Sequence, residues 1–114
     1  MNTETITKEY LEIGGLTLKI EFYYSMGGMN YFTSRTERRG YYLSVSPVEI
    51  GRDENGRIRS ESYMGFSGIK ECILEVKRKS KKSELEAEKH FSESRKKLVN
   101  HILEKNNLLE HKIE

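Results

Sequence analysis

Apolar and polar residues alternate near the start of the chain, and this alternation predicts a β-hairpin from Lys8 to Tyr24. Every second residue from Leu16 to Phe22 is apolar, and the residues between them are Thr, Lys and Glu. A two-residue turn at Gly14-Gly15 would pair Ile13 with Leu16 and Leu11 with Leu18. Both pairs fall on the same apolar face, so the turn and the burial pattern predict the same register.

Two more strands are expected in the N-terminal half. The first runs from Tyr41 to Glu49, with apolar residues at alternate positions. Pro47 lacks a backbone N–H, which predicts that this segment is an edge strand or is bulged at the proline. Asp53-Glu54-Asn55-Gly56 has the composition of a hairpin turn, and Arg57–Tyr63 would return as a strand.

The spacing of apolar residues becomes helical after Phe66. Ser67 is expected to cap a first helix with an apolar stripe formed by Ile69, Cys72, Ile73 and Val76. Ser83 and Glu86 have the spacing of a capping box, which predicts that a second helix begins there. Its buried face would contain Ala87, Phe91, Leu98, Val99, Ile102 and Leu103, and Asn106-Asn107 would end it.

Strands followed by helices indicate an α+β fold, here an antiparallel sheet of three to five strands with two C-terminal helices packed on it. The 114 residues are expected to form a single domain, with a β half at 1–66, a helical half at 67–107 and a tail at 108–114. Hydrophobic residues make up only 35% of the chain and charged residues 33%. This polar composition predicts a thin core, which a homodimer would complete.

Several classes of protein do not fit the sequence. Cys72 is the single cysteine, so no intramolecular disulfide can form. No secretory signal or membrane-length apolar run is found, which predicts a cytoplasmic protein without a membrane segment. His90, His101, His111 and Cys72 lack the paired spacing of metal ligands. No nucleophile–base arrangement can be identified, so we expect a protein without catalytic activity, metal or cofactor.

Two stretches are candidate partner-binding sites. The loop after the hairpin combines aromatic residues with arginines, at Tyr31, Phe32, Arg35, Arg38 and Arg39. The second stretch is a basic run of five cations, Lys77, Arg78, Lys79, Lys81 and Lys82. Arginine beside exposed aromatic rings suits base stacking or a protein interface, and the basic run suits an anionic partner. The alternatives are aromatic rings that close the end of the sheet and cations that complement a helix C-terminus.

A family resemblance bears on the partner. It is carried by residues 27–33 (GGMNYFT), 38–48 (RRGYYLSVSPV), 66–68 (FSG) and 76–82 (VKRKSKK). These segments resemble a family of small proteins from phages, plasmids and integrative elements of Gram-positive bacteria, a group that includes type II-A anti-CRISPR proteins. The resemblance implies direct binding and inhibition of an RNA-guided CRISPR nuclease or its guide RNA complex. Because the net charge is +2, the chain does not have the acidic character of a DNA mimic.

Two other functions remain open at this point. One is a sponge that sequesters a cyclic nucleotide immune signal, with an aromatic ring stacked on a base and arginines on the phosphates. The other is a small RNA-binding domain that uses the aromatic face of its sheet. Both would use the same aromatic and basic residues, so the sequence alone does not separate them from a nuclease inhibitor.

Overall fold

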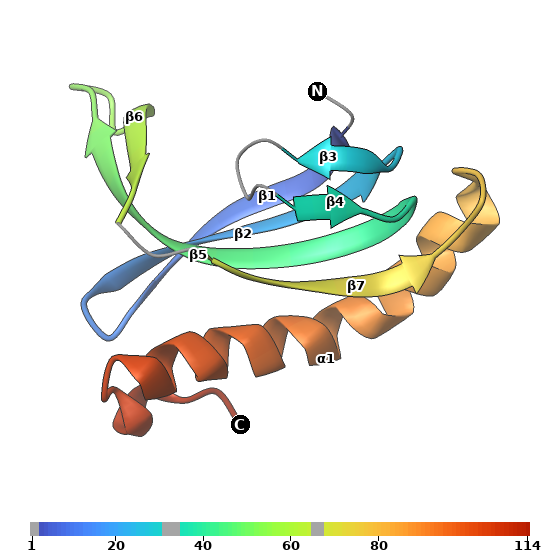
Figure 1. Ribbon diagram of the computed structural model, residues 1–114. Coiled ribbons are helices and arrows are strands. Elements are labelled where there is room, and N and C mark those ends of the chain that lie inside the picture. Colours follow the sequence, from blue (N-terminus) through green and yellow to red (C-terminus); the bar gives the residue numbers. More distant parts are fainter. Residues whose placement is uncertain (1–2, 31–34, 65–67) are drawn as a thin grey trace.

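The computed structural model describes residues 3–30, 35–64 and 68–114, and these residues form an antiparallel sheet with one long α-helix across it (Figure 1). The elements are β1 (Thr3–Ile13), β2 (Leu16–Ser25), β3 (Gly28–Asn30), β4 (Arg35–Glu37), β5 (Gly40–Arg52), β6 (Ile58–Tyr63), β7 (Ile69–Glu75), α1 (Lys81–Lys105) and the 3-10 helix η1 (Leu109–His111). The predicted α+β class is therefore confirmed.

The first hairpin has the predicted register. Ile13 pairs with Leu16 and Leu11 pairs with Leu18 across Gly14-Gly15. Both glycines have positive φ angles, 59° and 82°, which suit a primed two-residue turn. Leu18, Ile20 and Phe22 are almost completely buried, so the alternation in the sequence identified the core face of β2 correctly.

β5 is the central strand of the fold. It pairs with β2 along its first half, while its other edge pairs first with β7 and then with β6. The main sheet described here has the order β1-β2-β5-β6, with β7 also on β5, and β3 and β4 form a separate two-stranded sheet. In Figure 1, β3 and β4 lie across the sheet face opposite α1, and the β5–β6 hairpin bends away from the helix.

The prediction for Pro47 was wrong, because the proline lies inside this central strand. Its carbonyl accepts a hydrogen bond from the Met64 N–H at 3.2 Å. The N–H and C=O of a residue point to the same side of a strand. A backbone N–H at position 47 would therefore also point toward Met64, to the edge of β5 where β6 and β7 pair. There β7 pairing ends at Val45 and β6 pairing begins at Val48. The proline therefore stands between two partner strands, where an amide donor is not required.

The first predicted helix is not formed. Residues Ile69–Glu75 form strand β7, so the structure has one α-helix after the sheet among its described residues, and the two-helix prediction was wrong. A register shift between Tyr41 and Tyr42 marks a bulge in β7 near Ile73. The bulge interrupts strict alternation, and the apolar residues of β7 then have the spacing expected of a helix.

The helix α1 begins earlier than predicted and ends where predicted. Ser80 is its N-cap and forms a capping box with Ser83, in place of the expected box between Ser83 and Glu86. Asn106 is the C-cap, and Asn107 follows in the left-handed conformation with φ 57°. The expected buried face is confirmed, since Ala87, Leu98, Val99, Ile102 and Leu103 are buried.

The core lies between α1 and the helix-facing side of β2 and β5. It contains Leu18, Ile20, Phe22 and Tyr24 from β2, with Tyr41, Leu43 and Val45 from β5. Phe91 of α1 packs edge-on against Phe22 with ring centroids 5.6 Å apart. After the helix, the chain folds back, and Asn100 exchanges two 2.8 Å hydrogen bonds with the backbone of Ile113. Within the described residues, no helix has the length and apolar character needed to cross a membrane.

Candidate binding surface at the basic end of the sheet

Arg39 joins the two basic stretches that the sequence singled out. Its guanidinium donates from Nη1 to the Lys77 carbonyl at 3.0 Å and from Nε to the Met26 carbonyl at 3.1 Å. Its own carbonyl accepts from the Val76 N–H at 3.2 Å. Arg39 thus connects the start of β5 with the residues that follow β2 and β7. Because its donors are used in this way, Arg39 acts mainly as a structural link.

The Arg38 side chain is directed into solvent and does not bond the backbone of any described residue. Its side chain is 79% exposed and forms an ion pair with Glu75, with Nη1 3.2 Å from Oε1. Glu75 is itself 56% exposed, so the pair is of the solvated kind that contributes little to stability. The Tyr42 hydroxyl donates to the Arg38 carbonyl at 2.7 Å, which fixes the backbone while the guanidinium stays accessible. Arg38 can therefore exchange Glu75 for an anionic group of a partner.

The basic run does not lie at a helix C-terminus, contrary to the alternative weighed from the sequence. Lys77, Arg78 and Lys79 lie in the connection from β7 to α1, and Lys81 and Lys82 begin the helix. Cations at a helix N-terminus add to the positive end of the helix dipole, so this placement strengthens the local positive potential. Lys79 pairs with Glu4 at 2.6 Å, and this hydrogen bond raises the pKa of Lys79.

We call this surface the basic end. It consists of seven residues, Arg38, Arg39, Lys77, Arg78, Lys79, Lys81 and Lys82. All seven are exposed, and Glu4 and Glu75 pair with only two of them among the described residues. Met26 and Met29 lie on the adjoining segments and are 61% and 47% exposed. Thioether side chains adapt to irregular surfaces, so the cations have an adaptable apolar border.

The remaining predicted loop residues are only partly covered by the structure. Tyr31 and Phe32 lie outside the described residues, so their exposure stays a prediction. Arg35 belongs to β4, where its backbone pairs with Asn30. The structure therefore brings together Arg38, Arg39 and the basic run, and leaves the aromatic part of the predicted site untested.

A buried polar network holds β4 against the main sheet. The Glu37 carboxylate is almost fully buried and accepts from the Tyr23 hydroxyl at 2.9 Å and from Lys70 Nζ at 2.8 Å. Burial, together with the hydrogen bond to Glu37, raises the pKa of Tyr23. Tyr23 stacks on Tyr42 with ring centroids 5.5 Å apart, and Lys70 lies over the Tyr42 ring. This network positions β4, which leads into Arg38 and Arg39.

The members of this network could not be recognised in the sequence. Glu37 stands among three arginines, so the sequence suggests that it is an exposed charged residue of the loop. Lys70 is 33 residues away along the chain, and its predicted helix would have directed it elsewhere. The one usable signal was Glu37 itself, since it is the single acid in a strongly basic loop.

A second polar cluster fixes the β5–β6 hairpin at the other end of the sheet. Lys19 Nζ lies 2.6 Å from the Glu61 carboxylate, and the Tyr10 hydroxyl also donates to Glu61. These hydrogen bonds from Lys19 and Tyr10 lower the pKa of Glu61. Lys19 also lies 5.5 Å from the centre of the Tyr63 ring. The cluster links β6 to β1 and β2, although β6 is not a neighbour of either strand in the sheet.

The lowered pKa of Glu61 predicts a stabilising contribution that disappears in acid. A carboxyl whose pKa falls on folding stabilises the folded state above its unfolded pKa, near 4.5, and loses that contribution as the pH falls through the folded value. In the Glu61→Gln variant, the midpoint of urea unfolding should therefore differ from the parent more at pH 7 than at pH 3. The Glu93→Gln variant, which alters an exposed helix residue, serves as the control. An equal offset at both pH values would contradict the assignment.

Cys72 and the histidines have ordinary surroundings. Cys72 lies on β7 and is exposed, so the prediction that it belongs to the apolar stripe of a helix was wrong. Desolvation and the neighbouring Glu75 raise the pKa of its thiol, which favours the protonated form. His90 and His101 are exposed on α1. The described ranges 3–30, 35–64 and 68–114 hold no group of three or more His, Cys, Asp or Glu residues arranged for a metal ion.

The fold and the surface define a class of protein in broad terms: an α+β protein whose C-terminal helix covers one sheet face and which has a cluster of seven exposed cations at one end of the sheet. In a comparison with known proteins, no family model, no curated protein and no solved structure matches the chain. The function is therefore inferred from the chemistry of the basic end.

Proposed function

We propose that this protein is a non-enzymatic binding protein whose basic end docks on the anionic surface of a larger complex. The observation that carries the proposal is the double use of Arg39, which links the two cationic stretches into one surface. A patch of this kind accelerates encounter with phosphates or acidic protein surfaces and makes the affinity depend on salt.

The partner that fits best is a guide-loaded type II CRISPR nuclease of a bacterial host. Such a complex offers exposed RNA phosphates and charged protein surfaces together. The resemblance to proteins of phages and mobile elements points to the same partner, and an inhibitor of this kind would act in the host cytoplasm. Arg38, with its solvated ion pair, is the residue best suited to a directional contact, and Met26 and Met29 supply apolar area beside it.

The two other candidate functions receive less support. An RNA-binding sheet needs free aromatic rings, whereas Tyr23 and Tyr42 are buried and stacked on each other. A cyclic nucleotide sponge needs an aromatic ring beside the arginines, and the candidates for that role, Tyr31 and Phe32, lie outside the described residues. A nuclease inhibitor requires neither, since it can bind through the cations and the methionines.

The proposal is tested by measuring binding to a purified type II-A nuclease–guide complex and protection in a plasmid-interference assay. The test variant replaces Lys77, Arg78, Lys81 and Lys82 with Gln. The control replaces four other exposed cations, Lys8, Lys89, Lys96 and Lys105, with Gln. Both sets remove the same charge. None of the eight has an ion pair within the described ranges, so both variants should fold.

We expect the test variant to bind at least about tenfold more weakly at 150 mM salt, with the control close to the parent. If the cations bind phosphates, the slope of log K against log salt should become shallower by roughly one for each phosphate that is no longer neutralised. An Arg38→Ala variant should weaken binding on its own. A parent protein that neither binds nor protects would exclude this partner, and titration with cyclic dinucleotides and single-stranded RNA would then decide between the other two functions.

A further inference from the structure

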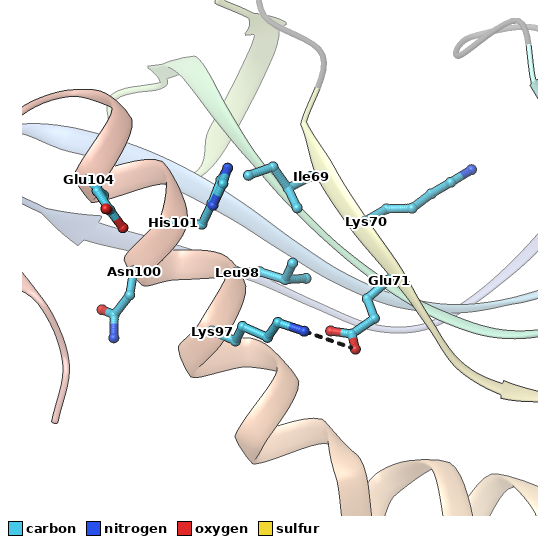
Figure 2. A pocket seen from close by; sticks show the side chains of 8 residues that line it. All are labelled: Ile69, Lys70, Glu71, Lys97, Leu98, Asn100, His101 and Glu104. Carbon is cyan, nitrogen blue, oxygen red and sulfur yellow. Dashed lines mark ion pairs between the residues drawn. The ribbon is translucent and has the colours of Figure 1, made fainter.

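A groove separates the outer edge of β7 from α1, on the face of the sheet that the helix covers (Figure 2). The groove is open to solvent and has a volume of about 510 Å³. Ile69 and Leu98 provide its apolar surface, and Lys97, Asn100 and His101 lie along the helical wall. Figure 2 shows Lys70 directed away from the groove, consistent with its ion pair to Glu37.

Glu71 is the unusual residue of the groove. It extends from β7 toward α1, and its Oε2 atom is buried and has no hydrogen-bond partner among the residues that the structure describes. Its Oε1 atom lies 3.6 Å from Lys97 Nζ, beyond ordinary hydrogen-bond length, and the Lys97 side chain is 72% exposed. The Glu71 side chain as a whole is 35% exposed, so a rotation of its carboxylate that exposes Oε2 would let both oxygens accept from a further cationic or N–H donor.

The outer edge of β7 is open beside this carboxylate. β7 pairs with β5 on one side, and no strand among the described residues pairs with its other side. An unpaired strand edge presents backbone donors and acceptors to any extended chain that lies beside it. The residues of β7 that line the groove, 69–71, precede the bulge near Ile73, so this part of the edge is regular.

We propose that the β7–α1 groove binds an extended peptide segment of a partner protein, which adds as a strand to the edge of β7 and places an arginine against Glu71. The strand pairing uses the free edge, and the planar guanidinium can bond both oxygens of the carboxylate, displacing the loosely held Lys97. Apolar residues two positions before and after the arginine point to the same side and would lie against Ile69, which is half-buried. This site is separate from the basic end and does not depend on the function proposed above.

The test uses the purified chain and blocked synthetic peptides. The probe Val-Thr-Arg-Thr-Val-Thr places the arginine and both valines on one face. A second peptide has Glu in place of Arg, and a third carries an N-methyl group on every backbone amide so that neither of its edges can pair as a strand. Backbone amide shifts locate each peptide by NMR, and titration gives its Kd. The protein variants are Glu71→Gln and, as a matched control on the outer face of α1, Glu93→Gln.

We expect the arginine peptide to shift the amides of residues 69–72 and 97–101 and to bind about tenfold or more tightly than the Glu peptide, the ratio expected from one charge-assisted hydrogen bond. N-methylation should remove binding, Glu71→Gln should remove the preference for arginine, and Glu93→Gln should change neither. Absence of shifts at β7 at millimolar peptide, or equal binding of the Arg and Glu peptides, overturns the proposal. Shifts of the same amides on dilution without peptide would also overturn it, because a second copy of the chain would then occupy the edge.

Discussion

An aspartate at position 18 is expected to abolish the cooperative unfolding transition. Leu18 of β2 is 0% exposed, and its side chain lies in the core between the sheet and α1. The substitution places a charge where neither water nor a partner is available, which costs more than about 4 kcal/mol. Small domains are stable by only about 5–15 kcal/mol in total, so most or all of the folded population should be lost. Circular dichroism during heating measures the effect.

The control for this experiment is Leu85→Asp. Leu85 lies on α1 but is 52% exposed, so the same chemical change there should shift the melting temperature by a few degrees at most. Retention of a cooperative melt by Leu18→Asp near that of the parent would mean that α1 does not pack on this face of the sheet.

Replacement of Glu37 by Ala is expected to have the second largest effect, a loss of about 3–5 kcal/mol in the free energy of unfolding. The carboxylate is buried and bonded to both Lys70 and Tyr23. Its removal leaves a largely buried ammonium group without its counter-charge and a buried hydroxyl without its acceptor. Urea unfolding followed by Tyr fluorescence gives the free energy for comparison.

Two further variants make the result specific. Glu37→Gln keeps an acceptor for Tyr23 while removing the charge that pairs with Lys70, so its loss should be intermediate. Glu75→Ala removes the exposed partner of Arg38 and should cost no more than about 1 kcal/mol. If Glu37→Ala and Glu75→Ala unfold at the same urea concentration, the buried network is not what holds β4 to the sheet.

The parts of the fold that depend on local pattern could be predicted from the sequence. Strict alternation in β2 and a Gly-Gly turn predicted the register of β1 and β2 next to the turn, and Asn106-Asn107 marked the end of α1. Asp53 begins the predicted turn before β6, and its side chain accepts from the backbone N–H groups of Asn55 and Arg57. In each case the residues that determine the geometry are close neighbours in the chain.

The errors arose where distant residues determine the structure. The bulge near Ile73 and the helix-facing Glu71 disturb the alternation of β7, so its apolar residues matched a helical spacing. Strand formation there depends on pairing with β5, about 30 residues earlier, which no local propensity records. Ser80 was missed as the helix cap because its partner is Ser83, whereas the usual capping box has Glu or Gln at that position.

The candidate site was predicted in its composition but not in its assembly. Both cationic stretches were recognised from charge density, yet nothing in the sequence indicates that Arg39 donates to the Lys77 carbonyl, 38 residues away. Arg39 was expected to contact a partner. Its guanidinium instead donates to backbone carbonyls of this chain, so its role is mainly structural. The network of Glu37, Lys70 and Tyr23 is of the same kind, because it joins three separate strands.

The position of α1 after every strand has a consequence for how the chain is made. During synthesis from the N-terminus, the hairpin of β1 and β2 can form as soon as it leaves the ribosome, because its pairing is local. Its apolar row of Leu18, Ile20 and Phe22 nevertheless stays uncovered until Leu98–Leu103 has been translated. At about 5–20 residues per second, that interval lasts on the order of 4–16 seconds. During this interval the nascent sheet therefore exposes an apolar face of the kind that ribosome-associated chaperones bind.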